Sequence, residues 1–205
     1  MGIFHHLTRK PWLPEQSEID NQVSGGAVAL QTAKVGLRVF LFPISALFTL
    51  FLIAYLMRMS FSDWQTLHDP WLLWINTAVL VLSSLALQRS RMLVDGGEVT
   101  GMRTYFMLGG VFAFAFLGGQ LAAWQQLADM GVYADTNPSH SFFYLFTALH
   151  GLHLLGGLVA WGRTVFKIKA GVDVEHLRLS VELCTIYWHY LLVVWVVMFG
   201  LLLAT

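Results

Sequence analysis

The sequence contains little cysteine and little charge, and each shortage excludes a class of protein. A single cysteine, Cys184, stands among 205 residues, so neither an intrachain disulfide nor a cysteine-based metal site can form. Asp, Glu, Lys and Arg make up 12% of the residues, whereas a soluble domain carries about 25%. The net charge is zero and no basic run exceeds two residues. Nucleic-acid binding therefore has no electrostatic support.

Catalytic patterns are missing as well. We find no nucleophile–base pair, no phosphate-binding loop and no carboxylate dyad in the sequence. The apolar stretches hold almost no ionisable groups other than histidine, whereas a transporter or pump places such groups along its path. The sequence thus predicts no catalytic residue in this chain.

Long apolar segments dominate what is present. Hydrophobic residues make up 57% of the chain. Five apolar segments are each about as long as one membrane crossing requires. They span about residues 34–58, 70–88, 104–127, 141–163 and 180–204. We predict an all-α membrane protein: a polar cytoplasmic tail at 1–33, then a five-transmembrane-helix bundle at 34–205. Asn137–Ser139 predicts a turn and a helix N-cap before the fourth segment.

Basic residues alternate between the connecting loops. Lys and Arg occur before the first segment, between the second and third, and between the fourth and fifth. The other two loops carry acids and no Lys or Arg. Because loops rich in Lys and Arg stay on the cytoplasmic side, this pattern predicts the N-terminus inside and the C-terminus outside.

Three histidines lie inside apolar segments, where imidazole is costly unless it faces protein, a cavity or a cofactor. His150 and His153 lie on one face of the fourth segment, and His189 lies in the fifth. His150 and His189 are both near mid-membrane, so they could meet and hold a b-type haem or a metal. The alternative is hydrogen bonding between helices. We favour the latter, because only one histidine is available on the fifth segment.

Charged residues near the membrane surface admit two interpretations. Glu182, near the start of the fifth segment, either pairs with Arg178 or contacts a lipid headgroup or a partner. Arg163 and Lys167 either flank a cytoplasmic helix end in the usual way or hold an anionic phospholipid. In the third segment, small residues spaced by four predict close helix packing, within the bundle or against another subunit. They are Ala115, Gly119 and Ala123, with Gly118 and Ala122 in a second row.

Three motifs together resemble subunit III of haem-copper terminal oxidases. Thr147–His153 resembles that family's threonine-x-x-histidine-glycine-leucine-histidine signature. Glu182, followed by Tyr187–Tyr190 and Trp195, resembles its glutamate and tyrosine-tryptophan-histidine-phenylalanine…valine-tryptophan motif. Leu108–Trp124 resembles its leucine-glycine…phenylalanine…glutamine…tryptophan pattern. The resemblance covers about residues 35–203 and is to the five-helix bacterial form.

The resemblance implies a non-catalytic subunit of a bacterial oxidase that reduces oxygen to water. It implies no cofactor in this chain, haem and copper in partner subunits, and bound phospholipid. Subunit I would be the direct partner, with subunit II and other respiratory subunits nearby, in the bacterial inner membrane. The histidines then become structural. We expect an inter-helix polar lock, a set of polar contacts joining the fourth and fifth helices, made by His150, His153, Glu182, Trp188 and His189.

The sequence departs from the family pattern at three acids. No acid stands at Pro43–Ser45, Ala123 replaces a glutamate, and Leu192 replaces an aspartate. A proton-related role that depends on those acids is therefore unsupported in this chain. Two alternatives stay open: a nitric-oxide-reductase-associated relative of the same fold, and a small b-haem membrane cytochrome.

Overall fold

The computed structural model describes residues 26–65, 71–172 and 174–204, and within them it is entirely helical apart from turns. The five long helices are α3 (Gly26–Arg58), α4 (Leu72–Asp95), α5 (Val99–Asp129), α6 (Pro138–Lys169) and α7 (Val174–Leu203). Each contains a stretch long and apolar enough to cross a membrane. The predicted all-α class with five crossing helices is confirmed.

The helices extend beyond the apolar segments. α4 continues to Asp95 and α6 to Lys169, past the predicted ends at 88 and 163. Hydropathy marks only the lipid-crossing part of a helix, whereas backbone hydrogen bonding continues into the polar residues that follow. α3 begins at Gly26, within the stretch expected as a tail. Most of that tail, residues 1–25, lies outside the described residues.

The chain divides into two compact units, residues 1–43 and 44–205, and the division falls within α3 at Pro43. Of the first unit, the structure describes only the beginning of α3. The second unit contains the rest of α3 and all of α4 to α7.

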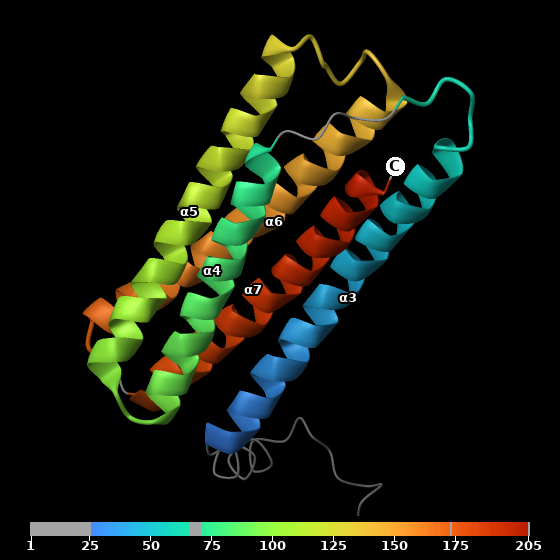
Figure 1. Ribbon diagram of the computed structural model, residues 1–205. Helices are drawn as coiled ribbons and strands as arrows, with labels where there is room; N and C mark the ends of the chain where they lie inside the picture. Colours follow the sequence, from blue (N-terminus) through green and yellow to red (C-terminus); the bar gives the residue numbers. More distant parts are fainter. Residues whose placement is uncertain (1–25, 66–70, 173, 205) are drawn as a thin grey trace, which may run out of the picture. The chain divides into compact units, whose positions relative to one another are not determined.

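In the second unit, α4 to α7 form an up-down-up-down bundle (Figure 1). α4 packs on α5, α5 on α6, α6 on α7, and α7 returns to α4. Neighbouring helices are antiparallel, as short connections require. Residues 44–58 of α3 contact α6 and α7 through side chains. The ring centroids of Phe51 and Phe146 are 6.3 Å apart, and the hydroxyls of Ser45 and Tyr190 are 2.9 Å apart.

The helix ends follow from local sequence. Gly97, Gly131 and Gly171 have positive φ values of 80°, 78° and 69° just after α4, α5 and α6, the left-handed conformation that stops a helix and favours glycine. At the start of α6, the Asn137 side chain accepts a hydrogen bond from the Ser139 backbone N–H at 3.0 Å. The predicted N-cap is confirmed.

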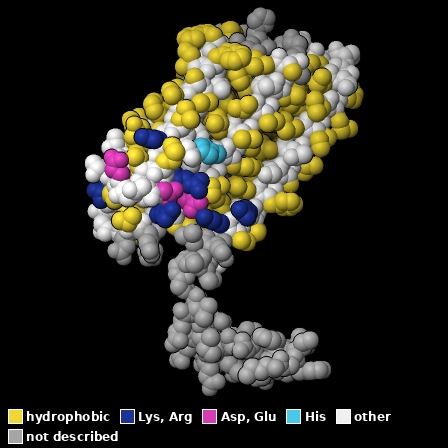
Figure 2. Space-filling model, turned by 60° about the horizontal axis from the view of Figure 1, so that its bottom comes forward, with side chains coloured by type: hydrophobic (Ala, Val, Ile, Leu, Met, Phe, Trp, Pro, Cys, Tyr) yellow, Lys and Arg dark blue, Asp and Glu magenta, His cyan; other side chains and the backbone are white. Residues whose placement is uncertain are grey.

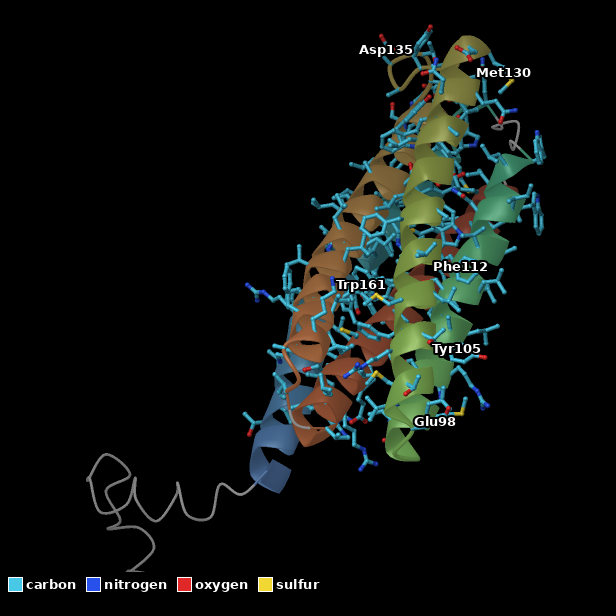
Figure 3. The ribbon with its side chains drawn as sticks, turned by 90° about the vertical axis from the view of Figure 1, so that its left-hand side faces the viewer. Glu98, Tyr105, Phe112, Met130, Asp135 and Trp161 are labelled. Carbon is cyan, nitrogen blue, oxygen red and sulfur yellow. The ribbon has the colours of Figure 1, made fainter. Side chains whose placement is uncertain are left out.

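Glycines let the helices approach closely inside the bundle. A Cβ atom on Gly110 of α5 would lie 2.2 Å from the Trp161 ring of α6, and the Trp161 indole donates to the Phe106 carbonyl at 2.9 Å. Figure 3 shows Trp161 on the α6 ribbon beside α5. Of the two predicted rows of small residues, Gly119 faces Asn76 of α4, whereas Gly118 has open space around it. Close packing within the bundle therefore uses only part of these rows.

Charge gathers at the end of this unit where the α4–α5 and α6–α7 turns lie. Figure 2, with that end turned forward, shows Lys and Arg side chains interleaved with Asp and Glu, and hydrophobic side chains along the flank. Arg178 donates to Asp95 there at 2.5 Å. The opposite end carries the α5–α6 loop, with Met130 and Asp135 labelled in Figure 3 far from Glu98.

Candidate functional site

The longest polar feature inside the bundle is a line of side-chain hydrogen bonds between α4 and α7. We call it the α4–α7 seam. Its members on α4 are Thr77, Ser83, Ser84, Gln88 and Arg91, and on α7 they are Glu182, Thr185, Trp188, His189 and Trp195. Residue numbers fall along α7 as they rise along α4, which is the register of antiparallel helices.

The centre of the seam joins three helices. The Trp188 indole, fully buried, donates to the Ser83 hydroxyl at 3.0 Å. Ser83 in turn donates to the Gly109 carbonyl of α5 at 2.7 Å. Nearer one end, the Trp195 indole donates to the Thr77 hydroxyl at 2.9 Å. Each indole N–H thus finds the partner that burial demands.

His189 is held by two α4 side chains. Its Nε2 lies 3.1 Å from the Gln88 side-chain oxygen, and its Nδ1 is hydrogen-bonded to the Ser84 hydroxyl. Since an amide oxygen only accepts, Nε2 carries the proton and Nδ1 accepts from Ser84. Both nitrogens are therefore occupied by hydrogen bonds to α4.

Two ion pairs also join α4 and α7. Arg91 donates to Glu182 at 2.8 Å, with the side chains 32% and 13% exposed. Arg178 pairs with Asp95 in a more exposed position, at 56% and 40%. Glu182 thus pairs with Arg91 on α4, whereas Arg178, one of the partners considered for it, pairs with Asp95. A half-buried ion pair is worth more than an exposed one, because solvent screens it less.

The α6–α7 interface is made mostly by rings and a backbone carbonyl. The Tyr187 hydroxyl donates to the carbonyl of His153 at 2.9 Å. A Cβ atom on Gly157 would lie 2.8 Å from both the Tyr187 and the Trp188 ring. The His153 ring bonds its own helix, because its Nδ1 donates to the Leu149 carbonyl at 2.7 Å. Its ring centroid lies 5.4 Å from that of Phe48 on α3.

His150 is fully buried. Its ring centroid lies 5.1 Å from Trp195 of α7 and 5.9 Å from Phe116 of α5. Neither of its nitrogens has a hydrogen-bond partner in the described part of the chain. The hydrogen bonding between helices that we expected for His150 is therefore not seen among the described residues.

The five residues of the expected polar lock are therefore not gathered into one α6–α7 contact. Trp188 contacts both neighbours of α7, since its ring lies on Gly157 of α6 and its N–H bonds α4. The side-chain hydrogen bonds of Glu182 and His189 go to α4. His150 and His189 do not share a ligand position, because His189 uses both nitrogens elsewhere.

Sequence reasoning missed the α4 side of the seam. Ser83, Ser84 and Gln88 are polar residues inside an apolar segment, and in lipid such groups need partners. Thr77 continues the same polar stripe about two turns before Ser84, and Arg91 continues it about one turn after Gln88. That stripe was the available signal that α4, not only α6, faces α7.

The lipid candidates Arg163 and Lys167 lie on exposed positions near the end of α6. Lys167 donates to the Ser180 hydroxyl at 3.0 Å. Among the described residues, no group of three or more His, Cys, Asp or Glu side chains is placed to hold a metal ion.

At the α3–α4 loop, Arg58 forms a bidentate ion pair with Asp63, with one N–O distance of 2.7 Å. This hydrogen bonding lowers the pKa of Asp63. The Asn137 side chain donates to the Asp63 carbonyl at 2.9 Å, so the same loop is tied to the start of α6.

Five helices long and apolar enough to cross a membrane define a multi-pass membrane protein. No family model matches the chain. It is nevertheless 29% identical over 199 residues to "Cytochrome c oxidase subunit 3" of Thermostichus vulcanus, covering 91% of this chain and 96% of that protein. The protein of that name from Synechocystis sp. is also 29% identical, over 80% of this chain and 72% of its own length.

A third relative, "Probable cytochrome c oxidase subunit 3" of Nocardia farcinica, is 29% identical over 60% of this chain and 61% of its own. The chain is thus a homologue of cytochrome c oxidase subunit 3 proteins from several bacteria. The resemblance inferred from the motifs is confirmed, and it supports a terminal oxidase subunit III.

Proposed function

We propose that this chain is a non-catalytic subunit III that packs on the catalytic subunit of a bacterial haem-copper terminal oxidase and stabilises it. The observation that carries the proposal is the similarity to the Thermostichus vulcanus protein over nearly the full length of both chains. The assembly reduces oxygen to water, with haem and copper in its partner subunits. This chain lies in the inner membrane with its N-terminus inside and its C-terminus outside.

The seam supports a structural role for this chain's own histidines. An axial haem ligand needs a free imidazole nitrogen, whereas both nitrogens of His189 are hydrogen-bonded to Ser84 and Gln88. Haem ligation by His189 would break at least one of these bonds between α4 and α7. We therefore prefer the oxidase subunit to the b-haem cytochrome. His150, His153, Glu182, Trp188 and His189 act, in this proposal, by fixing α7 against its neighbours.

Phospholipid binding is the second part of the proposal. Arg163 and Lys167 are exposed near the end of α6 that the loop charges assign to the cytoplasmic side. Exposed cations at this depth attract anionic headgroups, at about 1 kcal/mol for each Lys or Arg near the surface. We propose that these two residues hold an anionic phospholipid of the inner leaflet.

A deletion strain tests the role. Without this chain, the membranes should retain haem-containing subunit I, while oxygen consumption per haem should fall or decay faster during turnover. Wild-type chain supplied in trans should restore it. Unchanged oxygen consumption and unchanged stability of the complex after deletion would contradict the proposal. A separate experiment tests the lipid site. The purified complex carrying Arg163→Gln and Lys167→Gln should contain less lipid phosphorus than the wild-type complex. Lys169→Gln is the control.

A further inference from the structure

Three buried polar atoms in the bundle have no hydrogen-bond partner in the part of the chain that the structure describes. They are Nε2 of Gln120 and both ring nitrogens of His150. Gln120 is 4% exposed and His150 is 0% exposed, so neither side chain reaches the surface. Buried polar groups without a partner are rare in folded proteins, because each costs about 1–3 kcal/mol.

The two side chains share one neighbourhood at the centre of the bundle. The Phe116 ring of α5 contacts the rings of His150 and Trp195, with centroids 5.9 Å and 5.0 Å away. Gln120 follows Phe116 by one helical turn, on the same face of α5. The Asn76 amide lies beside both of these α5 residues, 3.2 Å from the Phe116 carbonyl and 3.5 Å from the Gln120 side-chain oxygen.

Exchanging the nitrogen and oxygen of the side-chain amides does not give Gln120 its missing hydrogen-bond partner. If the nitrogen and oxygen of Gln120 were exchanged, its NH₂ group would face the NH₂ group of Asn76, and the oxygen would become the unpaired atom. Movement of the Asn76 amide toward α5 is blocked as well. The Asn76 side-chain oxygen lies so close to Gly119 that a Cβ atom there would be 2.0 Å away. Exchange of these amide atoms therefore leaves one polar atom of Gln120 without a partner in the described part of the chain.

We propose that His150 and Gln120 bind an internal water molecule between α5, α6 and α7. A neutral imidazole offers one donor and one acceptor, and the Gln120 NH₂ group offers a further donor. Water accepts two hydrogen bonds and donates two, so one molecule can accept from Gln120 and donate to the bare nitrogen of His150. The Phe116 and Trp195 rings contact the imidazole on this side of the bundle. The site is independent of the proposed oxidase role, since it follows from buried atoms alone.

The sign of a stability change tests the proposal. If water occupies the site, His150→Phe removes one of its partners and the thermal midpoint of the purified chain in detergent falls by several degrees. If no water is bound, the same substitution deletes two unpaired polar atoms and the midpoint rises. His153→Phe is the ring-matched control on the same helix. Its ring is half-buried and donates through Nδ1 to the Leu149 carbonyl one turn away, so we expect the smaller change.

A double substitution and a density map separate water loss from poor packing of the larger ring. With a shared water, Gln120→Met combined with His150→Phe should cost less than the sum of the single changes. A map of the intact complex that resolves other internal waters should show density within hydrogen-bond distance of His150 and Gln120. A raised midpoint in His150→Phe, additive single changes, or a map without density at His150 would each overturn the proposal.

Discussion

Trp188 of α7 and Gly109 of α5 are joined through one hydroxyl group, that of Ser83 on α4. The indole donates to this hydroxyl at 3.0 Å, and the hydroxyl donates to the Gly109 carbonyl at 2.7 Å. A serine can act as this link because it accepts and donates at the same time. Three helices therefore depend on one small side chain at the centre of the bundle.

Ser83→Ala should destabilise the protein by about 1–3 kcal/mol, since it leaves the buried Trp188 N–H without a partner. The control is Ser90→Ala on the same helix. Ser90 is also buried and donates to an α5 carbonyl, that of Met102 at 2.9 Å, but no N–H–to–Ser90 bond is seen among the described residues. Denaturation of the purified chain in mild detergent measures both. An equal loss in the two variants would contradict the three-helix link.

Gly157 allows α7 to approach α6, and its neighbour Gly156 offers a matched control. A Cβ atom on Gly157 would meet the Tyr187 and Trp188 rings at 2.8 Å, whereas at Gly156 the nearest atom is 4.0 Å away. Gly157→Ala should therefore cost about 1–3 kcal/mol through overpacking. Gly156→Ala should be neutral or slightly stabilising, because alanine favours the helix. Thermal midpoints of the two variants decide, and similar values would argue against close α6–α7 contact.

The two ion pairs between α4 and α7 should differ in strength. Glu182→Gln weakens the half-buried pair with Arg91 and should destabilise by about 1–3 kcal/mol, since hydrogen bonds to charged groups are the stronger kind. Asp95→Asn breaks the exposed pair with Arg178 and should cost about 0–1 kcal/mol. Raising the salt concentration should reduce the effect of Asp95→Asn more than that of Glu182→Gln. The reverse order of sensitivity to salt would contradict the burial argument.

Asp63 gives a pH-dependent contribution at the α3–α4 loop. Its hydrogen bond with Arg58 lowers the Asp63 pKa below the ordinary value of 3.8. A carboxyl with a lowered folded-state pKa stabilises above 3.8, and the stabilisation disappears as pH falls through the lowered value. The difference in thermal midpoint between wild type and Asp63→Asn should be present at pH 7 and constant down to about pH 5, then vanish in stronger acid. A difference that persists in acid would show that another contact is responsible.

The number and class of the helices could be predicted because lipid leaves an apolar segment only one common way to satisfy its backbone. The N-cap at Asn137 was predictable for an equally local reason. The rotation of α7 about its own axis could not be predicted from the sequence. We paired its histidine with α6 because those helices are consecutive, yet α7 lies between α6 and α4, and His189 bonds Ser84 and Gln88.

His150 shows a further limit of the sequence. The spacing of His150 and His153 placed both on one helix face, but three residues advance a helix by less than a full turn. This offset leaves His150 fully buried, with its ring near Phe116, while His153 is half-buried near Phe48. Only the positions of the neighbouring helices distinguish the two. The oxidase resemblance, by contrast, depended on the order of the motifs and did not need those positions.

Affinity purification of this chain from its own membranes tests the central claim most directly. A tagged chain extracted in mild detergent should bring down subunits I and II of a haem-copper oxidase, with haem absorbance in proportion to subunit I. His189→Ala should weaken that association while leaving the haem content of subunit I near normal. Recovery of the chain without any oxidase subunit, or of the isolated chain with its own Soret band, would contradict the account.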